Sequence, residues 1–130
     1  MLRLQDFAGK VILVESMATW CPPCREQQLQ AQLALRRLEA GSVVYVSLDV
    51  DPRESRDTLR AYADRNRFAW TFAVGTPELL RLMSDDLGDV VLDPPATPIV
   101  VLGTDGSVTL TELGIKSSDR LVALAKAHGA

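Results

Sequence analysis

Cys21 and Cys24, in the stretch ESMATWCPPCREQQ (residues 15–28), are the only cysteines of the chain, and two prolines separate them. In CxxC motifs the accessible cysteine commonly has a pKa lowered from about 8.5 to roughly 7 or below, which makes it a nucleophile near neutral pH. The second cysteine lies one helical turn further along, where its sulfur can attack a mixed disulfide and release the bound partner. Pro22 and Pro23 carry no amide hydrogen, so they stiffen the turn and remove two donors to the sulfurs. This pattern indicates thiol–disulfide exchange.

Other interpretations of the cysteines are weaker. As a structural staple the pair closes a very short loop and removes little chain entropy, on the order of 2 kcal/mol. A zinc site needs about four ligands, and the only histidine, His128, lies near the far end of the chain. Two unrelated buried thiols would not be expected side by side at a strand-to-helix junction, although free cysteines often behave as small apolar residues. We therefore favour a redox pair.

Composition limits the classes of function. The chain has 130 residues, is 47% hydrophobic, and carries a net charge of −3 with a pI near 5.1. This size fits a single domain, residues 1–130, with a core of its own. Basic residues are scattered among acidic ones and the apolar runs are short, so we expect neither nucleic acid as a partner nor membrane contact by this domain.

Short β-branched runs alternate with helical patterns along the chain. We expect strands at residues 11–16, 43–49, 68–74, 99–102 and 108–113. We expect helices from Pro22 to about residue 40, from a cap at Asp51 to about residue 66, from Thr76 through residue 83, and from a cap at Ser117 or Ser118 to residue 129. The order β-α-β-α-β-α-β-β-α predicts an α/β domain with a mixed central sheet.

This order places Cys21 just after the first strand, in the first turn of the first helix. A helix N-terminus has unpaired N–H groups and a partial positive charge, and both favour a thiolate. We therefore expect Cys21 to be the exposed thiol with the lowered pKa and Cys24 to be the shielded one.

The segments VILVESMATWCPPCRE and ATPIVVLGTDGSV resemble the thioredoxin superfamily, and together with GKVILV they resemble its TlpA/ResA-like branch. The resemblance rests on a Trp directly before the CxxC motif, an apolar strand upstream, and a Thr-Pro followed by an apolar strand and a DG turn. It implies a thioredoxin-like fold with helices around a mixed sheet, and a TlpA-like central insertion within residues 49–97. The implied activity is that of a thiol-disulfide oxidoreductase acting as a reductant, with no cofactor beyond the redox-active disulfide.

The resemblance also implies catalytic roles: Cys21 attacks, Cys24 resolves, and Glu15 stands where thioredoxins keep a buried acid beneath the second cysteine. The strand around Glu15 is otherwise apolar, so burial should raise its pKa above the usual value of about 4.3 and suit it to accept the proton of Cys24. Alternatively, Glu15 faces water at an uncovered end of the sheet.

Five residues are expected to contact the substrate: Trp20, Pro22, Pro23, Thr97 and Pro98. By the resemblance, Trp20 packs beside the cysteines and Pro98 is a cis-proline that faces the CxxC motif. We hypothesise that Thr97 offers its backbone N–H and C=O to an extended segment of the substrate, as in strand addition. Trp20 could instead be a core residue, and Pro98 could simply begin a strand.

The partners implied are cysteine-containing protein substrates and a protein electron donor, and we expect a monomer. The expected location is extracytoplasmic, periplasmic or membrane-tethered, with the targeting segment absent from this chain; a cytoplasmic location is the alternative. The competing function is a non-catalytic thioredoxin-fold adaptor or a copper-chaperone-like binding module. The spacing of two residues and the position of His128 disfavour copper, since chaperones of related fold use a wider spacing and a late histidine near the site.

Overall fold

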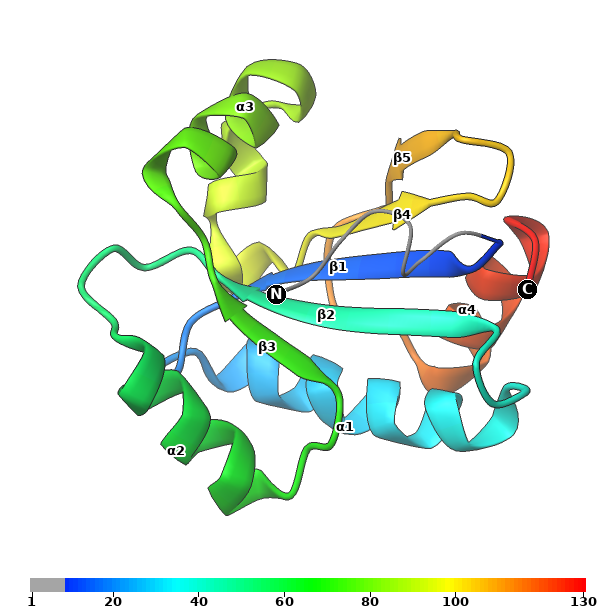
Figure 1. Ribbon diagram of the computed structural model, residues 1–130, viewed down its shortest axis with the longest axis horizontal. Helices are drawn as coiled ribbons and strands as arrows, with labels where there is room; N and C mark the ends of the chain where they lie inside the picture. Colours follow the sequence, from blue (N-terminus) through cyan, green and yellow to red (C-terminus); the bar gives the residue numbers. More distant parts are fainter. Residues whose placement is uncertain (1–8) are drawn as a thin grey trace.

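The computed structural model describes residues 9–130, in which strands and helices alternate in the predicted order (Figure 1). The strands are β1 (Val11–Met17), β2 (Val43–Asp49), β3 (Thr71–Val74), β4 (Ile99–Leu102) and β5 (Val108–Leu110). The α-helices are α1 (Pro22–Arg37), α2 (Arg56–Asn66), α3 (Pro77–Leu87) and α4 (Ser118–Ala127). Two short 3₁₀ helices, η2 (Asp89–Leu92) and η3 (Pro94–Ala96), lead from α3 to β4.

The sheet has the strand order β3-β2-β1-β4-β5. Strands β1, β2 and β3 are parallel, β4 runs antiparallel to β1, and β5 runs antiparallel to β4. The expected mixed sheet is therefore confirmed. Because β1 is the central strand, the residues that follow its carboxyl end lie in the middle of one edge of the sheet.

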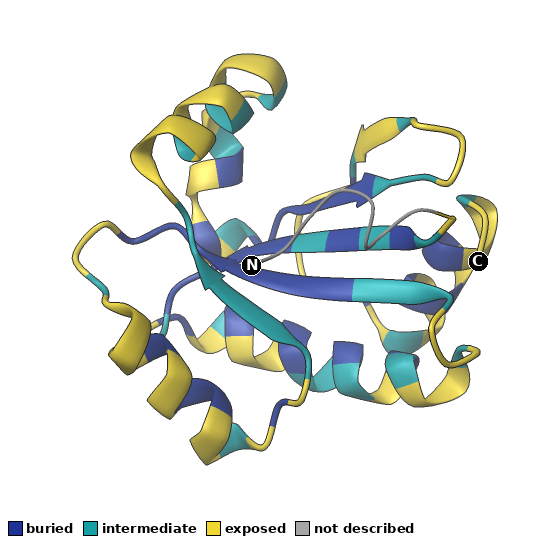
Figure 2. Ribbon diagram, viewed as in Figure 1, coloured by how far each residue is buried: buried dark blue, intermediate teal, exposed yellow. Residues whose placement is uncertain are grey.

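Helices α1 and α4 pack against each other beneath the sheet, and their small or apolar residues complete one core. This core contains Val11, Leu13, Ala31, Ala34, Tyr45, Ile99, Val101, Leu121, Val122 and Leu124. In Figure 2 the middle of the sheet is mostly dark blue, whereas α3 is largely yellow, and none of the α3 residues is buried. Packing therefore fixes the central strands and α1, and leaves α3 at the surface beside η2.

Helix α2 begins four residues later than the predicted cap would place it, so the prediction of Asp51 as its N-cap is wrong. The cap is Ser55, whose hydroxyl accepts the Thr58 N–H at 3.1 Å. Asp51 instead accepts bonds from Arg53 and from Trp20. Both its oxygens are engaged outside the helix, and the loop between β2 and α2 runs back to the residues that precede the cysteines.

Other boundaries shift for local reasons. Strand β3 begins at Thr71 because Arg67 takes a left-handed conformation, φ 58°, and ends α2. Phe68 then donates its N–H to Ala63 and stacks its ring on Trp70 at 4.8 Å instead of pairing with β2. Helix α1 ends at Arg37, earlier than expected, while α3 continues to Leu87, later than expected.

Within residues 9–130, no helix is both long enough and apolar enough to cross a bilayer.

The start of α4 yields a test of the local structure. Ser117 rather than Ser118 is the N-cap, because its hydroxyl accepts the Arg120 N–H at 3.1 Å. We expect Ser117→Ala to lower the free energy of unfolding by about 1 kcal/mol. Ser118→Ala should change it by less than about 0.5 kcal/mol, since the cap contact remains. Urea denaturation of the two variants measures the difference, and equal effects would contradict this assignment.

Candidate active site

Cys21 and Cys24 form a disulfide at the N-terminus of α1, with their Cα atoms 5.3 Å apart. Cys21 is the N-cap of the helix, and its sulfur accepts the Cys24 N–H at 3.2 Å. Pro22 and Pro23 occupy the first helical positions, where the missing amide hydrogens leave no helical hydrogen bond unmade. The expected placement of the cysteines after the first strand is therefore confirmed.

Both cysteines are buried: Cys21 is 2% exposed and Cys24 is 0% exposed. The expectation of an exposed Cys21 is therefore wrong for this disulfide-bonded form. The pair belongs to an apolar cluster that also contains Met17, Ala18, Leu59, Tyr62 and Phe68. The Sγ atom of Cys24 lies 3.3 Å from the carbonyl oxygen of Pro94 in η3, to which a reduced thiol can donate. A partner can reach Cys21 only if a covering segment moves.

The two residues before Cys21 are held by the loop between β2 and α2. Trp20 is 52% exposed, and its indole Nε1 donates to Asp51 Oδ2 at 2.7 Å. Thr19 donates its N–H to Glu54 Oε1 at 2.8 Å and its hydroxyl to Oε2. Trp20 therefore lies at the surface, so the alternative of a core residue is wrong, and its packing against the cysteines stays a prediction. The pattern of the sequence did not single out Asp51 and Glu54 for this role.

Asp49, at the end of β2, is a further acid that sequence reasoning missed. It is 1% exposed, and its Oδ1 accepts the Asp51 N–H at 2.9 Å. Burial, together with the neighbouring carboxyls of Glu54 and Asp51, raises the pKa of Asp49 to about 7. Arg53 donates to Asp51 and holds the pKa of that carboxyl well below its usual range. Within residues 9–130, Asp49 has no ion pair like the one that Asp51 makes with Arg53.

Glu15 is fully buried in the central strand, so the prediction of a buried acid is confirmed. Its Oε1 accepts bonds from the Ser47 hydroxyl at 2.6 Å and from Gln28 Nε2 at 2.9 Å. Gln28 lies one turn after Cys24 on α1, and its Oε1 accepts the hydroxyl of Tyr62, a member of the cysteine cluster. Burial is the main cause that raises the pKa of Glu15 from 4.5 to about 7, and these hydrogen bonds oppose it. A carboxyl with such a pKa can take up or release a proton near neutral pH.

Thr97 and Pro98 depart from expectation. Residues 9–130 contain no cis peptide bond, so the Thr97–Pro98 bond is trans, and the expected cis-proline is a wrong prediction. The chain is turned at this point by Thr97, which has a left-handed backbone with φ 49°. The Pro98 carbonyl accepts the Ser16 N–H at 3.2 Å and so joins this segment to β1.

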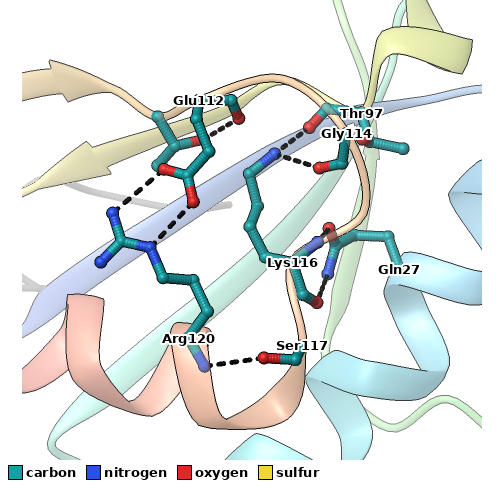
Figure 3. A network of polar contacts seen from close by, with 8 residues as sticks. Gln27, Thr97, Glu112, Gly114, Lys116, Ser117 and Arg120 are labelled. Carbon is teal, nitrogen blue, oxygen red and sulfur yellow. Dashed lines mark hydrogen bonds and ion pairs between the residues drawn. The ribbon is translucent and has the colours of Figure 1, made fainter.

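Thr97 is also not free to pair with a partner strand. Its N–H donates to Pro94 O at 2.9 Å, and its carbonyl accepts Lys116 Nζ at 2.5 Å (Figure 3). Thr97 is 1% exposed. In this structure both backbone groups are therefore engaged inside the protein, contrary to the expected strand addition. Nothing in the sequence pattern marks Lys116 as a buried residue near the site.

His128 lies far from the cysteines. Its carbonyl accepts the Thr104 N–H, and Thr104 follows β4 at the edge of the sheet where β1 begins, whereas Cys21 follows the end of β1. No group of three or more His, Cys, Asp or Glu side chains in the described part of the chain is arranged to hold a metal ion. The histidine and the cysteines are therefore not parts of one site.

The buried carboxyl of Glu15 gives a prediction for stability. Its folded pKa of about 7 exceeds the ordinary 4.5, so the folded state binds the proton more tightly and loses stability as the pH rises from about 4.5 to 7. We expect Glu15→Gln to gain stability relative to the wild type across this window. The gain should reach about 3 kcal/mol above pH 7, since one pKa unit corresponds to about 1.36 kcal/mol. Any hydrogen bonds that the substitution changes add the same amount to the difference in unfolding free energy at every pH. A difference in unfolding free energy that does not vary with pH would therefore contradict a raised pKa of Glu15.

No family model matches the chain. Over 62 residues, 47% of this chain, the sequence is 39% identical to the thioredoxin-like protein YneN of Bacillus subtilis strain 168, and the match spans 36% of that protein's length. A solved thiol-disulfide isomerase from Corynebacterium glutamicum superimposes with a TM-score of 0.77 at 18% identity, covering 100% of this chain and 88% of that one. A secreted Mycobacterium tuberculosis disulfide oxidoreductase, described as homologous to E. coli DsbE, gives 0.66 at 16% identity, covering 95% and 85%. The architecture of residues 9–130 is thus a thioredoxin-like α/β fold.

Proposed function

We propose that this chain is a thiol-disulfide oxidoreductase that acts on cysteine-containing proteins through Cys21 and Cys24. The observation that carries the proposal is the disulfide at the N-terminus of α1, set in an apolar cluster that hydrogen bonds link to a buried acid. The match to YneN and the fold shared with solved disulfide isomerases and oxidoreductases support it.

The reaction runs in two exchanges when the chain acts as a reductant. The Cys21 thiolate attacks one sulfur of a substrate disulfide, forms a mixed disulfide and releases the other substrate sulfur as a thiolate. Cys24 then gives up its proton and attacks the Cys21 sulfur, which frees the second substrate sulfur and leaves the Cys21–Cys24 disulfide. Two electrons pass to the substrate, whose two sulfurs each take up a proton. A protein electron donor restores the dithiol by the reverse sequence.

Glu15 is the proposed acceptor of the Cys24 proton. It is buried on β1 beneath α1, and Gln28 connects it to the cluster around the cysteines. Its pKa of about 7 matches what a general base needs near neutral pH. The hydrogen bonds from Ser47 and Gln28, and to a smaller extent the charge of Lys116, lower this pKa and so oppose the effect of burial.

The surface beside the cysteines suits a protein partner. Trp20 and Leu92 are exposed apolar side chains, and they line a cavity of about 220 Å³ with Val50, Asp51, Pro52, Arg53 and Pro94. Exposed aromatic and apolar groups at a polar rim are typical of sites where proteins associate. Trp20 and the Pro22–Pro23 turn are the proposed contacts, and the chain acts as a monomer.

An extracytoplasmic location is proposed from the resemblance and from the secreted oxidoreductase of similar fold.

Reduction of insulin disulfides with dithiothreitol as donor separates a catalyst from an adaptor. We expect turnover by the wild type, and loss of nearly all of it in Cys21→Ser, which lacks the nucleophile. Reduced Cys24→Ser, freed of dithiothreitol before it meets insulin, should instead accumulate a mixed disulfide with insulin, visible by mass spectrometry, because attack continues while no second thiol resolves the bond. If the wild type does not accelerate insulin reduction in this assay, the result would favour the non-catalytic adaptor.

The role of Glu15 predicts which step slows. In Glu15→Gln, attack by Cys21 should remain within about twofold of the wild type, whereas resolution by Cys24 should slow by roughly 10²-fold, the low end for loss of a general base. The resolution rate of the wild type should rise with pH through about 7, the pKa of Glu15, and this rise should vanish in the variant. Rapid-quench measurement of the mixed disulfide follows both steps. An unchanged pH profile would remove Glu15 from the mechanism.

A further inference from the structure

The turn that η3 forms lies against the disulfide at Cys24. Both α1 and β1 contact η3, and the Pro94 carbonyl lies 3.3 Å from Cys24 Sγ. Because Cys21 and Cys24 are 2% and 0% exposed, even a small thiol can attack only after one of the groups around them moves, and η3 is one of these groups.

Contacts beyond the turn hold it in place. The Thr97 N–H closes the turn on Pro94 O at 2.9 Å, and Ala96 O accepts the Gly114 N–H at 2.9 Å. The carbonyl of Thr97 accepts Lys116 Nζ at 2.5 Å. The segment that follows β5 therefore fastens the far end of the covering turn.

Lys116 is unusual among these groups because it brings a buried positive charge. It is 2% exposed, and its ammonium donates to the carbonyls of Thr97 and Gly114, at 2.5 and 2.8 Å (Figure 3). The nearby carboxylate of Glu112 is engaged by Arg120, at 2.8 and 3.0 Å, and the part of the chain that the structure describes gives Lys116 no ion pair. Burial lowers the pKa of Lys116 to about 8, against the opposing effects of Glu112 and Glu15. Its direct partners are thus backbone carbonyls, one of them at the end of the covering turn.

The backbone of Lys116 is tied to the helix that carries the cysteines. Its N–H donates to Gln27 Oε1 at 2.7 Å, and its carbonyl accepts Gln27 Nε2 at 3.0 Å. Gln27 is fully buried and lies three residues after Cys24 on α1. One residue thus joins the active-site helix, through its main chain, to the turn over the disulfide, through its side chain (Figure 3).

We infer that Lys116 is a positioning residue that holds the Pro94–Thr97 turn over the disulfide and thereby limits access of thiols to Cys21. Opening of the turn breaks the bonds from Lys116 and Gly114 without unfolding the core. The inference concerns the disulfide itself and holds whether or not the chain turns over protein substrates.

The rate of disulfide reduction by dithiothreitol tests this inference. One thiolate of the reagent attacks Cys21 Sγ and breaks the Cys21–Cys24 bond, and Cys24 leaves and takes up a proton. The second thiol of the reagent then attacks the mixed disulfide, so that Cys21 is released and the reagent becomes a cyclic disulfide. Acid quenching and maleimide labelling count the free thiols by mass. We expect Lys116→Met to react roughly tenfold faster, since a hydrogen bond from a charged donor shifts an opening equilibrium by about that factor or more.

Two controls separate local access from general loosening. Lys126→Met makes the same replacement at an exposed position of α4, so it should react like the wild type. Leu121→Ala removes a core side chain of α4 that is 1% exposed. It should lower global stability while leaving the reduction rate within about twofold of the wild type, because it leaves the turn intact.

A rate for Lys116→Met equal to that of the wild type would overturn the inference, and so would an equal acceleration in Leu121→Ala. If Lys116→Met does not fold, amide hydrogen exchange in the wild type decides. The Thr97 and Gly114 amides should then exchange faster than the amides of β4, through an opening that is insensitive to low concentrations of urea. Exchange of these amides only with global unfolding would show that the turn does not open separately.

Discussion

The hydrogen bond from the Cys24 amide to the Cys21 sulfur joins the helix start to the redox chemistry. The same sulfur that exchanges partners is the N-cap of α1, and Pro22 and Pro23 need no acceptor at the positions between. When Cys21 changes its bond from Cys24 to another sulfur, the cap acceptor stays in place. The helix therefore does not have to refold during an exchange, and β1, which delivers Cys21 to this point, can be rigid.

Polar groups buried beneath the helix add a second constraint. Glu15 and Lys116 carry opposite charges, and each acts on the pKa of the other in the direction that opposes burial. Gln27 and Gln28, neighbours on α1, bind Lys116 and Glu15 respectively. An apolar core at these positions would be simpler to stabilise, since buried charges are costly even when partnered. The glutamines instead fix both charged residues relative to Cys24, which lies one turn earlier on α1.

Sequence pattern was sufficient for features set by local chemistry. The apolar runs of β1 and β2, the proline start of α1 and the CxxC motif each depend on residues that are close together in the sequence, and each lies where predicted. Burial of Glu15 was also predicted from its apolar strand, although the sequence left a water-facing carboxyl as the alternative, and the structure confirms burial. The prediction of Asp51 as a helix cap was wrong because an aspartate carboxylate can accept hydrogen bonds either at a helix N-terminus or within a loop. In the structure it accepts the indole N–H of Trp20, a residue 31 positions away, and this contact cannot be predicted from the local sequence.

Contacts between distant segments could not be predicted in this way. Thr97 and Lys116 are 19 residues apart, and the bond between them depends on how β4 and β5 turn back toward α1. A lysine in a short polar segment is usually solvated, so its pattern predicts exposure. The contact of η3 with Cys24 likewise depends on the tertiary structure, since η3 reaches it from residues 94–96.

The charges around Cys21 bear on the direction of electron flow. A strongly oxidising CxxC pair is one whose reduced form is greatly stabilised, and that form carries the thiolate. Here a helix terminus and one amide favour a negative charge on Cys21, while the prolines contribute no donor. Glu54 binds the residue two positions before Cys21 and lies beside Asp49, whose pKa is raised first by burial and then by the carboxyls of Glu54 and Asp51. Arg53 offsets the charge of Asp51, whereas Asp49 has no ion pair among residues 9–130, so the carboxyls held beside Thr19 and Trp20 oppose the negative charge that the helix terminus favours.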